Sequence, residues 1–222
     1  MRRDQSFVSK EFRQKIRGLA VPIATAMGRL GLTPNGLTVI GFLGTGVAAL
    51  AAAGQLWLAA GILVLAFGIF DLFDGALARA TGQASTFGAF LDSTLDRTGE
   101  NLTYAGIAVG CALAGYPAGV ALAGLALATS SIVTYARARA ESVGVQGEIG
   151  VAPRSERLVI LAAALAICGL AGGLQAAGGL NLLPPGGALG NAALALGLGL
   201  IALLSAITIL QRIVYVRRQL EY

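Results

Sequence analysis

The sequence predicts an all-α integral membrane protein, a bundle of six transmembrane helices preceded by an amphipathic helix at the membrane surface. Two observations support this fold class. Of the 222 residues, 56% are hydrophobic and 12% are charged, and the mean hydropathy of +0.76 lies well outside the balance of soluble domains. Apolar stretches of the roughly 20 residues that a helix needs to cross a bilayer also recur along the chain. Six can be marked, at residues 37–54, 56–80, 87–113, 118–137, 157–175 and 190–211.

The chain before the first stretch, residues 1–30, is a basic arm. Apolar side chains recur in it at helical spacing, at Val8, Phe12, Ile16, Leu19 and Ile23. This pattern predicts an interfacial amphipathic helix lying on anionic lipid. A helix packed beneath the bundle fits the same residues, so both arrangements stay open. We therefore divide the chain into a juxtamembrane arm, 1–30, and one membrane domain, 31–222.

Lysine and arginine gather in four segments, namely the arm, residues 79–97, residues 137–157 and the tail from residue 212. The connections around Gln55, around Tyr116 and across residues 172–191 hold no charged residue. With six spans, all charged segments fall on one side of the membrane, and the positive-inside rule makes that side cytoplasmic. We expect a multi-pass protein of the cell membrane with both termini in the cytoplasm.

Two pairs of aspartates lie toward the charged ends of the second and third stretches. Asp71 and Asp74 are three residues apart and Asp92 and Asp96 are four apart, so each pair projects from one helical face. A hairpin around Gly82 would bring the two faces together. Pairing with arginines or capping of helix ends is the structural alternative, but acids within membrane spans are rare and mark functional sites.

Four crowded carboxylates repel one another and attract cations. The chain has no histidine, and hard oxygen ligands suit Mg²⁺ or Mn²⁺. Two such ions sharing carboxylates can steady the attacking and leaving oxygens of a displacement at phosphorus. The small residues Gly75, Ala78 and Gly88 would let a phosphate-bearing ligand approach the backbone, although without the acids around them helix packing would be the better explanation of each.

From Asp71 to Asp96 the chain fits the pattern D-x2-D-G-x2-A-R-x8-G-x3-D-x3-D at every fixed position. In this it resembles the CDP-alcohol phosphotransferase family. The resemblance implies six transmembrane helices with this pattern on the second and third, and a homodimer. It also implies attack of an acceptor hydroxyl on the phosphorus next to the diacylglycerol of a CDP-lipid, with CMP as the leaving group.

The resemblance further implies roles for individual residues. Asp71, Asp74, Asp92 and Asp96 would be ligands of two divalent ions, and Asp96 would also be the general base. The CDP-lipid would be bound by Thr33, Pro34, Asn35, Asp71, Asp74, Gly75, Ala78, Arg79, Ser85 and Gly88. Thr33 and Asn35 also fit the start of a helix, where either could be a cap.

The acceptor is expected to be a phosphorylated polyol, with inositol phosphate favoured. Four arginines lie in the charged segment 137–157, and their forked guanidinium groups match phosphate geometry, at Arg137, Arg139, Arg154 and Arg157. The ordinary positive-inside bias explains them as well. Asp96-Arg97 is similar to inositol-phosphate-using members of the family, whereas Glu100 replaces an aspartate that is frequent there. Glycerol 3-phosphate is the alternative acceptor.

Two other classes of function fit some of these features. A divalent-cation transporter also places acids within spans, but such sites lie near the midplane, whereas these acids lie in the cytoplasmic half. A non-catalytic lipid scaffold would not require the four acids. We therefore expect an enzyme whose partners are a CDP-diacylglycerol-type lipid, a phosphorylated polyol and membrane lipids, with no nucleic acid.

Overall fold

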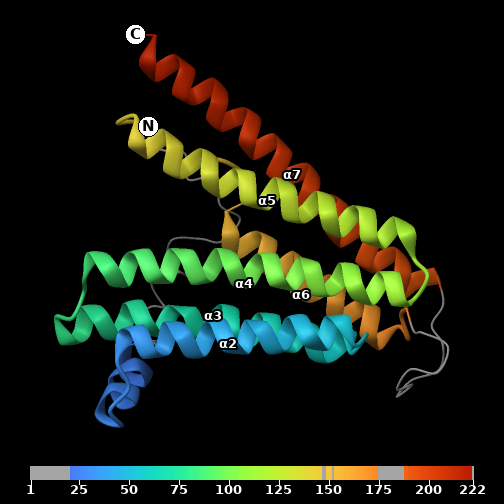
Figure 1. Ribbon diagram of the computed structural model, residues 1–222, viewed down its shortest axis with the longest axis horizontal. Helices are drawn as coiled ribbons and strands as arrows, with labels where there is room; N and C mark the ends of the chain where they lie inside the picture. Colours follow the sequence, from blue (N-terminus) through green and yellow to red (C-terminus); the bar gives the residue numbers. More distant parts are fainter. Residues whose placement is uncertain (1–20, 147–148, 152, 175–187, 222) are drawn as a thin grey trace.

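The computed structural model describes residues 21–146, 149–151, 153–174 and 188–221. Their secondary structure is helical, with no strand in these ranges, which confirms the all-α class. The main helices are α2 (Pro34–Ala53), α3 (Trp57–Thr81), α4 (Thr86–Leu113), α5 (Pro117–Ser142), α6 (Arg154–Leu170) and α7 (Ala188–Leu220). Figure 1 shows α2, α3 and α4 running side by side, with α5 and α7 inclined to them.

Four of these helices, α2, α3, α5 and α7, are long and apolar enough to cross a membrane. The predicted bounds of the first four stretches agree with α2 to α5 to within a few residues. α6 is shorter than predicted, with 17 residues, and α7 is longer, with 33. α4 carries four charged side chains, at Asp92, Asp96, Arg97 and Glu100. Both α4 and α6 nevertheless pack beside apolar helices, α4 on α2 and α5, and α6 on α3 and α7.

The helix ends that border the predicted hairpin follow from local chemistry. The Thr33 hydroxyl accepts a hydrogen bond from Gly36 N at 3.1 Å and caps α2, and the Ser85 hydroxyl accepts one from Gly88 N at 3.0 Å and caps α4. α3 ends at Gly82, whose φ of +69° lies in the left-handed region that glycine adopts without strain. The hairpin predicted around Gly82 is therefore confirmed.

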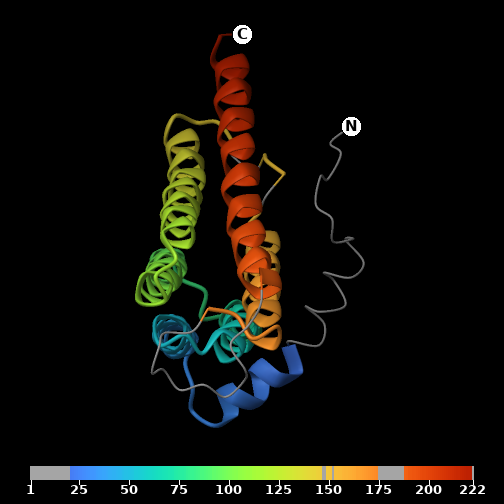
Figure 2. The same ribbon diagram turned by 90° about the vertical axis from the view of Figure 1, so that its right-hand side faces the viewer.

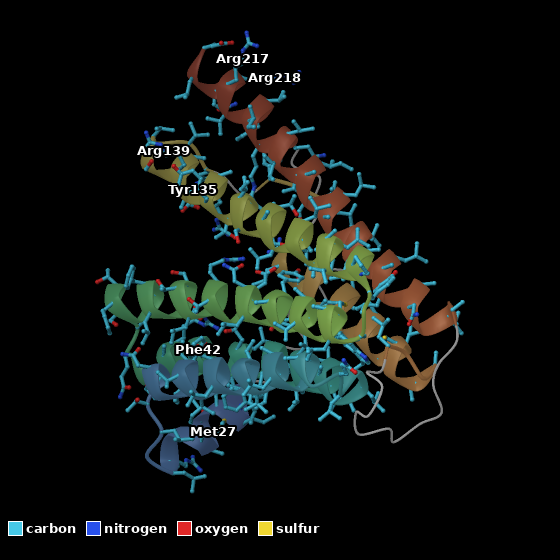
Figure 3. All side chains as sticks on the ribbon, turned by 45° about the vertical axis from the view of Figure 1, so that its right-hand side comes forward. Met27, Phe42, Tyr135, Arg139, Arg217 and Arg218 are labelled. Atoms are coloured by element: carbon cyan, nitrogen blue, oxygen red, sulfur yellow. The ribbon has the colours of Figure 1, made fainter. Side chains whose placement is uncertain are left out.

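The short connections from α2 to α5 lie at two opposite ends of the bundle. Residues 54–56 and 114–116, which carry no charge, form turns at one end, and residues 82–85 form the hairpin at the other (Figure 1). Figure 3 shows Arg139 near the far end of α5 and Arg217 and Arg218 at the end of α7. The charged ends of these helices thus lie toward the same end of the molecule as the α3–α4 hairpin.

Most of the predicted amphipathic arm, residues 1–20, lies outside the described residues. Residues 21–29 are helical, and Figure 2 shows this helix crossing beneath α2 and α3. Its Ala24 is fully buried with Leu37 of α2 and Leu77 of α3, and Met27 packs against the same cluster. The described part of the arm thus packs beneath the bundle.

The interior of the bundle is built from small side chains and a few large ones. Ala48, Trp57, Ile107 and Leu198 belong to the main buried cluster. Many large apolar side chains point outward instead, among them Leu43, Leu50, Leu196, Leu203 and Leu210. An apolar exterior around a closely packed interior is what a lipid environment requires, because lipid tails are as apolar as the side chains that face them.

Glycines let the helices approach closely. A methyl group on Gly106 or Gly110 of α4 would meet the backbone carbonyls of Ala49 and Ala52 of α2 at less than van der Waals distance. Gly61 of α3 faces α6 in the same way. These contacts fix α4 against α2 and leave the acids at the end of a rigid pair of helices.

We predict that Gly106→Ala lowers the free energy of unfolding by roughly 1–3 kcal/mol, because the added methyl forces two backbones apart. Gly124→Ala on α5 is the matched control, because nothing lies within 4 Å of a methyl placed there. The measurement is unfolding of the purified protein in detergent. Equal stability of the two variants would contradict close packing of α4 on α2.

Candidate active site

The α3–α4 hairpin brings the two aspartate pairs together, as predicted. One carboxylate oxygen from each of Asp71, Asp74 and Asp92 lies within 4.8 Å of the others. In the described residues α3 and α4 do not pack on each other, because both lie against α2. The three carboxylates therefore meet through their side chains, across an interval between the two helix backbones.

Asp74 is the most firmly held of the three. Its Oδ2 accepts a hydrogen bond from the Thr38 hydroxyl at 2.7 Å, and its Oδ1 accepts one from Gly75 N at 2.5 Å. The side chain is buried, so these bonds fix its orientation. Thr38 is not among the site residues predicted from the sequence. The signal for it was a hydroxyl one turn into an apolar span, on the face that meets α3.

A buried oxygen of Asp92 indicates that these residues fit a metal ion. Its Oδ1 is buried and has no hydrogen-bond partner among the described residues. A buried carboxylate oxygen without a partner is costly, and a bound cation removes that cost. The donors are all hard oxygens, which suit Mg²⁺ or Mn²⁺. The site therefore fits a divalent ion held by Asp71, Asp74 and Asp92.

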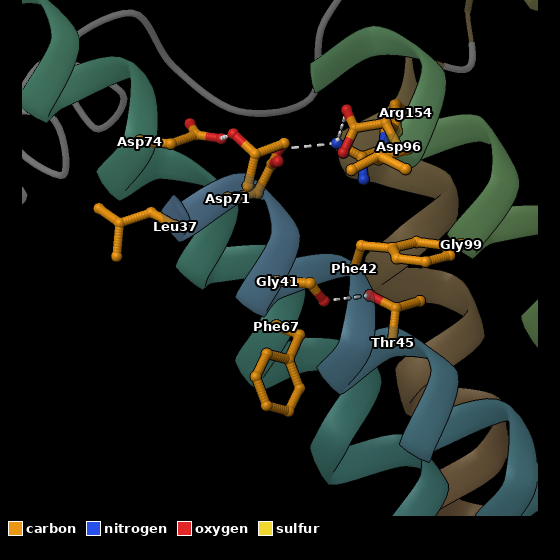
Figure 4. A pocket seen from close by; sticks show the side chains of 12 residues that line it. Leu37, Gly41, Phe42, Thr45, Phe67, Asp71, Asp74, Asp96, Gly99 and Arg154 are labelled. Atoms are coloured by element: carbon orange, nitrogen blue, oxygen red, sulfur yellow. Dashed lines mark hydrogen bonds and ion pairs between the residues drawn. The ribbon is translucent and has the colours of Figure 1, made fainter. Parts of the chain in front are cut away.

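Asp96 lies beside this group and pairs with an arginine from α6. Arg154 Nη1 is 2.5 Å from Asp96 Oδ2 and 2.7 Å from Asp71 Oδ2, as the dashed lines in Figure 4 show. Asp96 is thus linked to the three-oxygen group through Arg154 and Asp71. Its assignment as a metal ligand and as the base stays a prediction.

A pocket adjoins the acids and is lined by α2, α3, α4 and α6 (Figure 4). Asp71, Asp74, Asp96 and Arg154 form its charged part. The remaining lining comes from Leu37, Thr38, Gly41, Phe42, Thr45, Phe67, Leu95 and Gly99. The pocket therefore places the charged groups beside the Thr38 and Thr45 hydroxyls and a few apolar side chains at the end of the bundle that carries the acids.

The residues predicted to bind the CDP-lipid come together at the hairpin end. A methyl on Gly88 would lie 3.1 Å from Asn35 Oδ1, so the first turn of α4 lies beside the first turn of α2. The Arg79 guanidinium folds back over Gly75, where a methyl would lie 3.3 Å from its Nη1. Ala78 is half-buried on the same stretch of α3. Two of the predicted residues, Thr33 and Ser85, are the caps of α2 and α4.

The four arginines predicted to bind the acceptor phosphate lie in different surroundings. Arg137 pairs with Glu141 at 2.9 Å on the exposed side of α5, and Arg139 donates to the Ser142 hydroxyl at 3.2 Å. Arg154 lines the pocket. Arg157 is 2% exposed and pairs with Glu100 at 3.0 Å. Of the four, the structure brings Arg154 to the acids.

Residues 31–214 match the family described as CDP-alcohol phosphatidyltransferase, the one that the aspartate pattern resembles. The chain belongs to this family. It is 37% identical over 213 residues to the archaetidylinositol phosphate synthase of Pyrococcus horikoshii, covering 95% of this chain and 97% of that relative. It is also 37% identical over 202 residues to the phosphatidylinositol phosphate synthase of Cutibacterium acnes, covering 90% of this chain and 93% of that one.

Solved structures of one relative have the same fold. The Mycobacterium tuberculosis phosphatidylinositol phosphate synthase with CDP-DAG bound matches with a TM-score of 0.74 at 32% identity, covering 89% of this chain and 92% of that one. The same enzyme in complex with manganese and citrate also matches with a TM-score of 0.74, covering 89% and 88% of the two chains.

We predict that Asp92→Asn weakens Mn²⁺ binding by roughly tenfold or more, because it removes a ligand charge from the group. The rate of CMP release from CDP-diacylglycerol should fall by orders of magnitude in each of four variants, Asp71→Asn, Asp74→Asn, Asp92→Asn and Asp96→Asn. Mn²⁺ affinity can be measured by calorimetry on the purified protein. Glu141→Gln, which neutralises an exposed acid on α5, is the control and should bind Mn²⁺ as the unaltered protein does. Unchanged affinity in Asp92→Asn would remove Asp92 from the metal site.

Proposed function

We propose that this CDP-alcohol phosphatidyltransferase transfers the phosphatidyl group of CDP-diacylglycerol, or of a related CDP-lipid, to a hydroxyl of inositol phosphate and releases CMP. The observation that carries the proposal is the grouping of Asp71, Asp74 and Asp92 within 4.8 Å beside the Asp96–Arg154 pair. Relatives that match nearly the whole chain are phosphatidylinositol phosphate and archaetidylinositol phosphate synthases.

Asp71, Asp74 and Asp92, with Asp96 as a further ligand, would hold two Mg²⁺ or Mn²⁺ ions. When bound, such ions neutralise the pyrophosphate and make a nearby hydroxyl more acidic. The buried Asp92 Oδ1 without a partner supports this role, and the related mycobacterial enzyme was solved with manganese.

The protein's own groups position the reactants and move one proton. Asp96 takes the proton of the acceptor hydroxyl, whose oxygen forms a bond to the phosphorus next to the diacylglycerol. The bond from that phosphorus to the CMP oxygen breaks, and CMP leaves with the electron pair. Arg154 lies beside Asp96 and faces the negative charge that builds up during transfer.

The CDP-lipid is proposed to lie at the hairpin end of the bundle. Thr33, Pro34 and Asn35 at the start of α2 and Ser85 and Gly88 at the start of α4 would contact its headgroup. Gly75, Ala78 and Arg79 complete the nucleotide pocket. The adjacency of Asn35 and Gly88 supports a single pocket formed by these segments, and the related mycobacterial enzyme was solved with CDP-DAG bound.

The acceptor phosphate is proposed to be recognised by arginine. Arg154 is the member of the predicted set that is supported by its place at the acids. The contribution of Arg137, Arg139 and Arg157 stays a prediction. Glycerol 3-phosphate is the second candidate acceptor, because its phosphate presents the same chemistry to an arginine.

The membrane arrangement that we propose has six spans, with both termini and the acids on the cytoplasmic side of the cell membrane. Its support is that α4 and α6 pack beside the four apolar helices and that the charged helix ends lie at one end. Residues 1–30 would form a juxtamembrane arm on that side, and the protein would be a homodimer. The same placement argues against a cation transporter, whose acids would lie nearer the midplane.

The acceptor assignment is tested by supplying labelled inositol phosphate, glycerol 3-phosphate, inositol and serine, each with CDP-diacylglycerol and Mg²⁺. We expect inositol phosphate to be consumed at least tenfold faster than the others, with CMP released in equal amount. Arg154→Ala should raise the KM for the acceptor because it removes the guanidinium at the acids. Faster use of glycerol 3-phosphate would favour the alternative acceptor, and no CMP release with any acceptor would reject the transferase.

The orientation is tested by labelling single cysteines in a variant whose two native cysteines are replaced by alanine. Ser142→Cys lies at the charged end and Gly54→Cys lies in the uncharged turn, and both positions are exposed. A membrane-impermeant thiol reagent added to intact cells should label Gly54→Cys and not Ser142→Cys. The reverse pattern would overturn the proposed orientation.

A further inference from the structure

Two neighbouring ion pairs connect α4 and α6 across the interior of the bundle. In the described part of the chain, no Cα of α4 comes within 8 Å of a Cα of α6, because each helix packs on other neighbours. The two are bridged instead by long side chains. Asp96 and Glu100, one turn apart on α4, face Arg154 and Arg157 in the first turn of α6.

The ion pair between Arg157 and Glu100 is the more buried and the better defined of the two. Arg157 Nε donates to Glu100 Oε1 at 3.0 Å and its Nη2 donates to Oε2 at 3.2 Å, so the contact is bidentate. Arg97 Nη1 donates to the same Oε2 at 2.8 Å. Arg157 is 2% exposed and the Glu100 side chain is 12% exposed. A forked contact at this depth fixes orientation as well as distance and is weakly screened by solvent.

The ion pair between Arg154 and Asp96 is more exposed and lies at the cluster of acids. Arg154 reaches Asp96 and Asp71 through one nitrogen, and its side chain is 28% exposed. Arg154 is also the first residue of α6, and the preceding Pro153 provides no side-chain cap. The start of α6 therefore lacks the local anchor that Thr33 gives α2 and Ser85 gives α4.

The register of the two helices decides where Arg154 lies. Each residue of a helix adds about 1.5 Å of rise and about 100° of rotation. A slip of one residue at the start of α6 would carry the Arg154 guanidinium out of hydrogen-bond range of both acids. The ion pair between Glu100 and Arg157 opposes this slip, because Arg157 is on the same turn of α6 as Arg154.

We propose that Glu100, held by Arg97 and Arg157, is a positioning residue that sets α6 against α4 and thereby places Arg154 between Asp71 and Asp96. Its consequence for transfer rests on the proposed function, in which Asp96 and Arg154 act on the acceptor. Its consequence for the acids does not, because a guanidinium beside two carboxylates offsets part of the charge that attracts a divalent ion.

The sign of the effect on metal binding separates this role from a simple charge effect. Neutralising Glu100 removes a negative charge near the site, which by itself weakens attraction for a cation. If Glu100 acts by placing Arg154, its neutralisation lets Arg154 leave the acids, and Mn²⁺ then binds more tightly. Direct loss of the Arg154 charge has the same effect.

The test is a double-mutant cycle of Glu100→Gln and Arg154→Gln, with Mn²⁺ affinity measured by calorimetry without lipid substrate. Each single variant should bind Mn²⁺ severalfold more tightly, and the double variant no more tightly than Arg154→Gln alone. Glu221→Gln is the matched control, because it breaks an exposed ion pair with Arg217 within one stretch of chain. It should leave Mn²⁺ affinity unchanged.

Weaker or unchanged Mn²⁺ binding in Glu100→Gln, or additive effects in the double variant, would overturn the proposal. If Glu100→Gln does not fold, Arg157→Lys, which loses the fork but keeps the charge, takes its place in the cycle with the same two outcomes. In the transfer assay, Glu100→Gln should lower kcat/KM for the acceptor at least tenfold with little change in the KM for the CDP-lipid, and Glu100→Asp should recover most of it. A protein that passes the Mn²⁺ cycle but transfers no phosphatidyl group would refute the proposed function alone.

Discussion

The mutual repulsion of four aspartates at one end of an apolar bundle is the constraint on which the site depends. Neighbouring groups offset it in different ways. Thr38 and the Gly75 amide hold Asp74, and Arg154 neutralises part of the charge of Asp71 and Asp96. Asp92 keeps a buried oxygen without a partner in the described structure. The unbalanced charge that remains is what attracts a divalent cation.

The packing of the bundle maintains this arrangement. α4 packs on α2 through glycines whose Cα atoms lie against backbone carbonyls, and α3 also packs on α2. α2 therefore acts as a spacer that holds the two aspartate pairs at a fixed separation. The acids can approach closely through their side chains while the backbones that carry them stay apart.

Much of this could be predicted from the sequence, because its strongest signals are local. The lengths of apolar stretches gave helices α2 to α5 to within a few residues, and the three- and four-residue spacings placed the aspartate pairs on single faces. The partners of the arginines could not be predicted in the same way. Arg137, Arg154 and Arg157 all fit the positive-inside bias, and no periodicity shows that one is exposed, one meets Asp96 and one is buried against Glu100. Thr38 was missed for the same reason, since its partner is 36 residues away.

The shortness of α6 has a consequence for how two unlike substrates can meet. Its 17 residues span about 25 Å, whereas the hydrocarbon core of a bilayer is about 30 Å thick. In the proposed six-span arrangement, a helix of this length produces hydrophobic mismatch, which is relieved by local thinning of the membrane or by flanking side chains that reach toward the headgroups. In that arrangement the arginines of its first turn would lie at the floor of an indentation in the cytoplasmic leaflet. A water-soluble acceptor can descend into such an indentation, while a lipid donor reaches the same acids sideways without leaving its leaflet.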